Sequence, residues 1–314
     1  MTFAELQKLA AKKEAFIDKS LKDLQTDVAK LQRKMYDELI DKLLPQLKTE
    51  NGRLVRTSEN FAIINRQLDE LNKNFAAQFT TPMIKKFAEK MLKTFEMTDE
   101  FYKTGYNVST QAFAAMQEQS KWIYERVGIT KQGGIITGGY LDKLRDMPEV
   151  QTKVRNYIVS NVTSTAGLRD FQKGMKEIIQ GTKEVPGAVT RYFNQFTSDI
   201  YNQVDSAMNN VYAEAMELEY FVYFGTIMED SRCFCIKRAG KVFHKADADN
   251  WINDKSLIKG YRDGKYPYSP LIDRGGFNCR HSIAYISKQM AEYKGYNKAD
   301  AAAVVSAPCP DDSK

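Results

Sequence analysis

The sequence predicts a mainly α-helical protein with a small α+β module at its C-terminal end. Apolar residues recur at intervals of three and four through most of the first 219 residues, the spacing of amphipathic helices. Short segments rich in aromatic and β-branched residues follow, which favours strands. Three of the four cysteines and both histidines lie between Asp230 and Ile286. We therefore expect long N-terminal helices followed by a cysteine-containing β-hairpin module.

Length and composition are those of an ordinary globular protein. The chain has 314 residues, of which 43% are hydrophobic and 27% charged, enough to bury a substantial core. No apolar run approaches the roughly 18 residues that cross a bilayer, and the N-terminus does not read as a signal peptide. We expect no membrane span and synthesis in the cytoplasm. The net charge of +6 is mildly basic and assists contact with DNA or an acidic protein surface.

The first helix is expected from about Thr2 to Leu44, where Pro45 ends or kinks it. Its apolar residues form a short heptad seam. The seam consists of Ile17, Leu21, Leu24, Val28, Leu31 and Met35. Such a seam packs either against a neighbouring helix of the same chain or in an assembly interface, and the sequence leaves both open.

Local signals divide the rest of the first helical region. Asn51-Gly52 predicts a turn, after which Thr57 or Ser58 caps the next helix. Thr81-Pro82 is typical of an N-cap followed by the first helical position, and Thr98 is the expected cap of a further helix.

Five glycines between Gly128 and Gly139 indicate a flexible connection or a hairpin, because the pattern of a phosphate-binding loop is missing. Beyond it, Pro148 starts a helix, Gly181 ends the next one, and Pro186 opens a long helix that reaches about Glu219.

The C-terminal part is expected to contain short strands. Tyr220–Phe224 is the first, Cys235–Arg238 and Lys241–His244 form a hairpin turned at Ala239-Gly240, and Arg280–Ile286 returns beside them. The chain thus divides into an N-terminal helical region (1–127), a Gly-rich connection (128–147), a second helical region (148–219), the cysteine module (220–290) and a C-terminal tail (291–314).

Four side chains of the module have the chemistry of a structural zinc site, namely Cys233, Cys235, Cys279 and His281. Alternate residues of a strand share a face, so each pair converges if both segments are strands. The favoured interpretation is that the cysteines are small buried hydrophobes. His244 is a substitute ligand, although a single histidine after a hairpin more often makes an ordinary polar contact. A disulfide is disfavoured because cytosolic thiols stay reduced.

A second set of residues has the chemistry of a structural motif rather than of catalysis. Asp230, Arg232, Arg274, Asn278 and Arg280 can tie loops together through charge-assisted hydrogen bonds, and Gly240 serves the turn. The sequence offers no recognisable nucleophile with its base and no paired carboxylates, so we expect no enzyme and assign no catalytic residue.

Three elements follow one another in this part of the chain: Asp230 with Arg232 and Cys235, then Gly240–Phe243, then Asn278–His281. The pattern resembles the C-terminal module of phage minor head proteins of the Mu F-like family. There, an Asp-x-Arg with a nearby Cys, a Gly-Lys-Val-Phe-like hairpin and an Asn-Cys-Arg-Cys or Asn-Cys-Arg-His occur in the same order. The resemblance covers the last third of the chain.

The resemblance implies a structural minor head protein of a tailed bacteriophage that acts in head assembly. Its expected location is the phage head of the virion, and the host cytoplasm during assembly. Its expected partners are the portal or major capsid protein, other head proteins and packaged DNA. Where many members carry a Pro-Pro-x-His run, this chain has Arg274-Gly275-Gly276-Phe277. The alternatives are a phage-encoded nucleotide- or ADP-ribose-transferring toxin and a zinc-dependent nucleic-acid adaptor.

Overall fold

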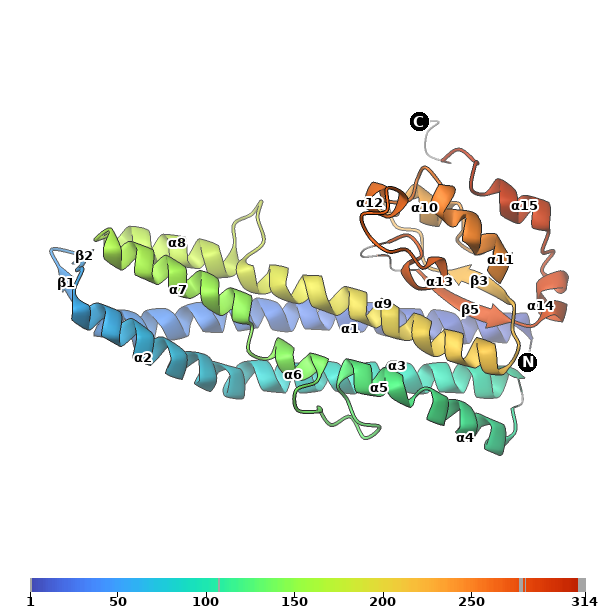
Figure 1. Cartoon of the computed structure of the whole chain (residues 1–314), viewed down its shortest axis with the longest axis horizontal. Coiled ribbons are helices and arrows are strands. Elements are labelled where there is room, and N and C mark those ends of the chain that lie inside the picture. Colours follow the sequence, from blue (N-terminus) through green and yellow to red (C-terminus); the bar gives the residue numbers. More distant parts are fainter. Residues whose placement is uncertain (1, 107, 277–278, 280, 310–314) are drawn as a thin grey trace. The chain divides into compact units, whose positions relative to one another are not determined.

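The structure is a computed structural model that describes residues 2–106, 108–276, 279 and 281–309 (Figure 1). It confirms the predicted fold class, with long helices followed by a small C-terminal α+β region. The chain divides into two compact units, and each combines stretches that are distant in the sequence. The first unit comprises Met1–Lys19, Met91–Tyr124 and Ser198–Lys314, and the second comprises Ser20–Lys90 and Glu125–Thr197.

Nine α-helices form the described helical part of the chain. They are α1 (Phe3–Glu38), α2 (Ser58–Phe75), α3 (Thr81–Tyr106), α4 (Thr110–Gln119), α5 (Lys121–Val127), α6 (Tyr140–Leu144), α7 (Pro148–Thr163), α8 (Leu168–Gln180) and α9 (Ala188–Ala215). A π-helical turn η1 (Leu39–Leu43) and a 3-10 turn η2 (Leu44–Gln46) extend α1 past Pro45. A second π-helical turn, η3 (Ala76–Thr80), joins α2 to α3.

In the second unit, apolar stripes of α2, α7 and α8 face one another, and α7 contacts both other helices. The later part of the predicted heptad seam lies in this core, where Leu24, Val28, Leu31 and Met35 are buried. Ion pairs link the polar edges of neighbouring helices. In one of them, the Lys90 Nζ and the Asp23 Oδ2 are 2.5 Å apart. This part of the first helix therefore packs within its own chain.

Two local predictions for this region are confirmed. Asn51-Gly52 turns a short hairpin of β1 (Thr49–Glu50) and β2 (Arg53–Leu54), and both turn residues have positive φ. Thr57 caps α2, because its side chain accepts a hydrogen bond from the Asn60 backbone N–H at 3.2 Å.

The predicted caps at Thr81-Pro82 and Thr98 are wrong. The helix continues through Pro82 because η3 shifts the hydrogen-bond register just before it, where proline has no N–H to donate. Thr98 lies buried inside α3, and its hydroxyl donates back to the Thr94 carbonyl at 3.1 Å. That local bond satisfies the hydroxyl without ending the helix.

The boundaries of the second helical region agree closely with the prediction. Pro148 starts α7, and Gly181 ends α8 with a φ of 83°. The helix expected from Pro186 to about Glu219 is α9, which ends earlier, at Ala215. Residues 128–147 form turns, an isolated antiparallel bridge between Ile129 and Ile135, and the short helix α6.

The C-terminal part of the first unit contains an antiparallel three-stranded sheet of order β4-β3-β5. Its strands are β3 (Tyr220–Phe224), β4 (Val242–His244) and β5 (Ser282–Ile286), close to three of the predicted segments. The predicted strand at Cys235–Arg238 is wrong, because Cys233–Ile236 forms the short helix α10. The strand β4 pairs with β3 instead, through the register Phe221↔Phe243.

Short helices follow and separate the strands of this sheet. They are α11 (Lys245–Ala248), the 3-10 helix η4 (Asp249–Asn253), α12 (Lys259–Arg262), α13 (Pro270–Asp273), α14 (Lys288–Tyr293) and α15 (Lys298–Ala303). Within the predicted tail, α15 contacts β4, and Ala301 and Val304 are buried. The part of the tail up to Val304 therefore belongs to the packed structure.

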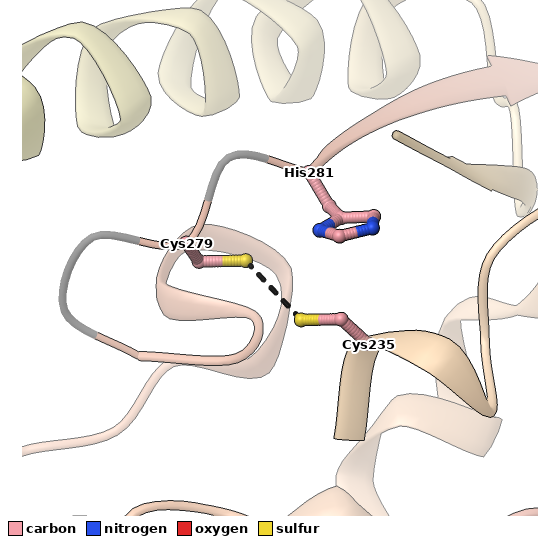
Figure 2. A group of neighbouring side chains, drawn as sticks. All are labelled: Cys235, Cys279 and His281. Atoms are coloured by element: carbon pink, nitrogen blue, oxygen red, sulfur yellow. Dashed lines mark hydrogen bonds between the residues drawn. The ribbon is translucent and has the colours of Figure 1, made fainter. Parts of the chain in front are cut away.

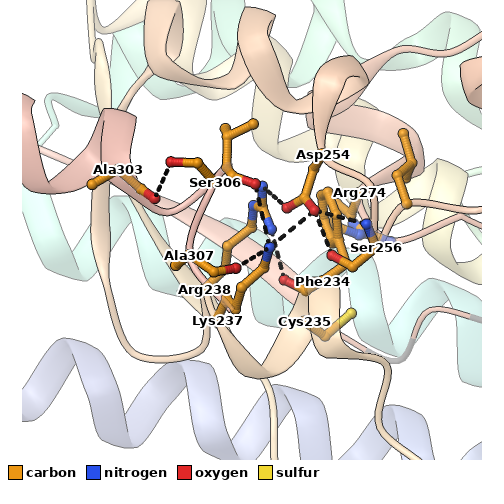
Figure 3. Close-up of polar contacts among 12 residues, drawn as sticks. Phe234, Cys235, Lys237, Arg238, Asp254, Ser256, Arg274, Ala303, Ser306 and Ala307 are labelled. Carbon is orange, nitrogen blue, oxygen red and sulfur yellow. Dashed lines mark hydrogen bonds and ion pairs between the residues drawn. The ribbon is translucent and has the colours of Figure 1, made fainter. Parts of the chain in front are cut away.

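A buried group of charges lies beside the sheet (Figure 3). The Asp254 carboxylate contacts the Lys237 Nζ at 2.9 Å and the Arg238 Nη2 at 2.8 Å, and the carboxylate side chain is 1% exposed. Lys237 also donates to the Ala307 carbonyl at 3.3 Å. The guanidinium of Arg238 lies 3.6 Å from the centre of the Phe234 ring. These contacts tie α10 to η4 and to the C-terminal segment.

Helices of the same unit hold the sheet in place. The Tyr106 hydroxyl donates to the Tyr285 carbonyl at 2.6 Å, and the Tyr285 hydroxyl donates to Asn210 Oδ1 at 2.6 Å. A buried ion pair between the Lys13 Nζ and the Asp205 Oδ1, 2.7 Å apart, joins α1 to α9 although the two residues are distant in the sequence. Among the described residues, no helix has the length and apolar character needed to cross a membrane.

Replacing the buried carboxylate tests how much the module depends on it. We expect Asp254→Asn to lower the free energy of unfolding by about 3–5 kcal/mol, because it leaves Lys237 and Arg238 buried without a counter-charge. Urea denaturation followed by Trp251 fluorescence, in a Trp122→Phe background, measures this. The control Asp263→Asn removes an exposed partner of Lys259 and should cost less than about 1 kcal/mol. Equal effects of the two variants would contradict the prediction.

The effect of Asp254→Asn should also depend on pH. Burial alone would raise the pKa of Asp254, but hydrogen bonds from Ser256 and Lys237 outweigh it and hold the pKa below its usual value. The pKa of Asp254 is lower in the folded state than in the unfolded state. The stability that its ionisation contributes is therefore present above about pH 4 and is lost as pH falls through the folded-state pKa. We expect the stability gap between wild type and Asp254→Asn to narrow from pH 5 to pH 2. A stability gap that stays constant over this pH range would show that ionisation of Asp254 does not contribute to stability.

Candidate metal centre

Three of the four predicted ligands meet in one buried cluster (Figure 2). The ligand atoms of Cys235, Cys279 and His281 all lie within 4.8 Å of one another. Their side chains belong to residues that are 2%, 3% and 3% exposed. The two sulfurs are 3.7 Å apart, and both thiols are free.

Separate parts of the fold deliver the three side chains. Cys235 lies on α10, and Cys279 follows a turn in which its N–H donates to the Gly276 carbonyl at 3.0 Å. His281 directly precedes β5, whose register pairs Ser282 with Phe224. Continuing that register by one residue places His281 opposite Gly225, at the end of β3.

Two glycines allow the backbone to approach the cluster. A Cβ at Gly275 would lie 2.7 Å from the Cys235 Sγ and 3.3 Å from the Cys279 Sγ. A Cβ at Gly225 would lie 2.1 Å from the His281 Cδ2, and Gly225 has a φ of 154°. Both positions therefore require glycine, and the chain encloses the three side chains on these sides.

Tyr223 is a fourth member of the cluster that the sequence analysis missed. Its hydroxyl oxygen lies 3.4 Å from the Cys235 Sγ and 3.6 Å from the Cys279 Sγ. Its ring stacks on the His281 ring, with centroids 5.4 Å apart. The sequence offered one signal for Tyr223, since strand alternation puts it on the same face as Phe221. That signal does not say which residues lie opposite this face, because they come from a distant strand.

The shared hydrogen bonds separate the acidities of the two buried thiols. The hydrogen bond from Cys235 stabilises the Cys279 thiolate and holds the pKa of Cys279 well below its usual value, aided by His281 and Arg274. The same hydrogen bond and burial raise the pKa of Cys235. A bound cation would favour the thiolate form of both cysteines.

Cys233 lies outside this cluster, contrary to its predicted place in the ligand set. In a helix, residues two apart point to nearly opposite sides, so Cys233 and Cys235 diverge on α10. Cys233 is beside Cys309 and Ser256, and burial and the hydrogen bond with Cys309 raise its pKa to about 11. His244, the predicted substitute ligand, is not in the cluster either, because its ring caps α11.

The predicted structural motif is partly brought together. Arg232 Nη1 donates to the Gly275 carbonyl at 3.2 Å, which ties α10 to the loop carrying Cys279. The Gly240 N–H donates to the Tyr223 carbonyl at 2.8 Å, and Gly240 has a φ of 77° in the turn before β4. Asp230 is exposed just before α10. Asn278 and Arg280 lie outside the described residues.

Thiolates and an imidazole are the donors that zinc prefers in structural sites. The cluster therefore has the chemistry to hold a divalent, borderline-soft metal ion, and its burial would shield that ion from solvent. No protein-family model, no curated protein and no solved structure matches this chain.

Serine variants of the cysteines test whether the cluster binds metal. We expect Cys235→Ser and Cys279→Ser to abolish binding of added zinc and to expose residues 220–309 to protease, because structural metal sites supply folding energy. Elemental analysis after dialysis measures zinc, and limited proteolysis measures exposure.

Cys233→Ser is the matched control, because this thiol lies on the same helix but outside the cluster. It should keep both zinc binding and protease resistance. If the two cluster variants resemble Cys233→Ser in both assays, the cluster does not bind metal and the buried thiols serve only packing.

Proposed function

We propose that the chain is a structural minor head protein of a tailed bacteriophage, associated with the portal or the major capsid protein and acting in head assembly. The observation that supports this proposal is the convergence of the Mu F-like motif in one folded module. Cys235 of the first element lies against Cys279 of the third. Gly240 of the second element bonds to Tyr223, whose hydroxyl contacts both of these cysteines. Motif elements that are separated in the sequence therefore have a common structural purpose.

The helical part fits a role in contacting other head proteins. Its helices have apolar faces that build the core and polar faces that carry interspersed lysines and acids, as in Lys86 with Asp27, 2.6 Å apart. Such faces suit polar, specific contacts with a protein surface. The net charge of +6 also favours contact with packaged DNA.

The test is quantitative mass spectrometry of gradient-purified particles of the phage that encodes the chain. We expect the chain at a low, fixed ratio to the major capsid protein, inside the head rather than in the surrounding lysate. Deletion of the gene should lower the yield of filled heads, and supply of the wild-type chain in trans should restore it.

Other outcomes favour the alternatives. Absence from particles together with abundance in infected cells would contradict the proposal and favour an assembly factor or a transferase toxin. Zinc-dependent binding to nucleic acid that weakens steeply as salt rises, without incorporation into particles, would favour an adaptor.

A further inference from the structure

We propose that the C-terminal module binds one zinc ion in a closed, four-coordinate site, with the Tyr223 phenol oxygen as the fourth ligand beside the two cysteines and the histidine. This ligand set replaces the predicted one, in which Cys233 held the fourth position. The inference concerns the chemistry of the module and does not depend on the proposed role in the phage head.

The spacing of the donor atoms supports a tetrahedral site. With bonds of about 2.3 Å to sulfur and about 2.0 Å to oxygen, a tetrahedral zinc needs its sulfurs about 3.8 Å apart and each sulfur about 3.5 Å from the oxygen. The sulfurs of Cys235 and Cys279 are 3.7 Å apart, and the Tyr223 oxygen lies 3.4 Å and 3.6 Å from them. Three edges of the tetrahedron therefore have their required lengths before any ion is added.

Burial determines where the fourth ligand comes from. Tyr223 is fully buried at 0% exposure, as closely enclosed as the other three donors. The backbone at Gly275 and Gly225 fills the space beside the sulfurs and the imidazole. The Tyr223 phenol oxygen already contacts both sulfurs, so an ion bound between the sulfurs would also contact this oxygen. The protein itself therefore supplies the fourth ligand, which is a water molecule in open sites.

The charge around the cluster fits a third anionic ligand. Two thiolates, one phenolate and Zn²⁺ carry a net charge of −1. Arg274 is 1% exposed, and Arg232 Nη1 donates to the carbonyl of Gly275, whose Cα lies against both sulfurs. The Arg274 Nε has no hydrogen-bond partner in the part of the chain that the structure describes. A zinc centre with a net charge of −1 would compensate the buried charge of Arg274, whereas a neutral zinc centre would not.

The site would join segments that are distant in the sequence. Tyr223 belongs to β3, Cys235 to α10, and Cys279 and His281 to the chain entering β5. One ion would thus cross-link the central strand, the short helix and the loop from Arg274, as structural zinc does in other small modules.

The experiment titrates the reduced, metal-free full-length chain with zinc at neutral pH and records near-ultraviolet difference spectra. We expect one zinc per chain and a tyrosinate absorption that grows with it. In Tyr223→Phe the tyrosinate absorption should be absent, and zinc affinity, measured by competition with a chromophoric chelator, should fall at least about tenfold.

Tyr285→Phe is the matched control, because Tyr285 is another fully buried tyrosine of the same sheet and its hydroxyl bonds to Asn210. It should keep both the absorption and the affinity. Circular dichroism establishes that each variant is folded, and zinc X-ray absorption of the wild type should show two sulfur and two nitrogen or oxygen ligands without any substitution.

Two results would overturn the inference. Absence of zinc binding by the reduced wild type, at micromolar free zinc, would exclude the site altogether. Binding by Tyr223→Phe with wild-type affinity and the wild-type difference spectrum would exclude the tyrosine as a ligand. Either result leaves the proposed head function to be judged separately, because incorporation into particles is measured without reference to metal.

Discussion

The burial of the Trp251 indole is the constraint on which the C-terminal module depends. Its side chain is fully buried, and four aromatic rings meet it edge to face at centroid distances of 5.4 to 5.9 Å. Those rings belong to Phe221, Tyr223, Phe234 and Phe243. Each such pair contributes about 0.5–1.5 kcal/mol beyond the area it buries. One residue of η4 therefore fixes the positions of β3, β4 and α10 together.

That packing also places the candidate ligands. Tyr223 and Phe234 both touch Trp251, and each is next to or part of the metal cluster, since Phe234 directly precedes Cys235. Arg238, one helical turn after Phe234, stacks on the Phe234 ring and reaches Asp254. The aromatic core, the buried ion pairs and the thiols thus form one continuous structure. A substitution in any one of these three parts would shift side chains in the other two, because close-packed interiors transmit strain.

The helical part was largely predictable because its signals are local. The turn at Asn51-Gly52 and the cap at Thr57 depend on residues a few positions apart, and both are confirmed. The failures at Pro82 and Thr98 have a common cause. Each residue type favours a helix start on local grounds, but a register shift accommodates Pro82 and burial in the unit's core retains Thr98 within α3. Tertiary packing outweighed a preference of about 1 kcal/mol.

Residue spacing was enough to predict the helices, and residue type was enough to predict the sulfur and nitrogen donors of the last third, but one of the four predicted strands is a helix. Which of these donors meet depends on tertiary packing. Cys233-Phe234-Cys235 is too short to fix its own conformation, and the contacts of Phe234 and Arg238 hold it as a helix, so one sulfur turns inward and the other away. Tyr223 enters the cluster because β3 pairs with β5, more than fifty residues later, and such non-local pairing leaves no local trace in the sequence.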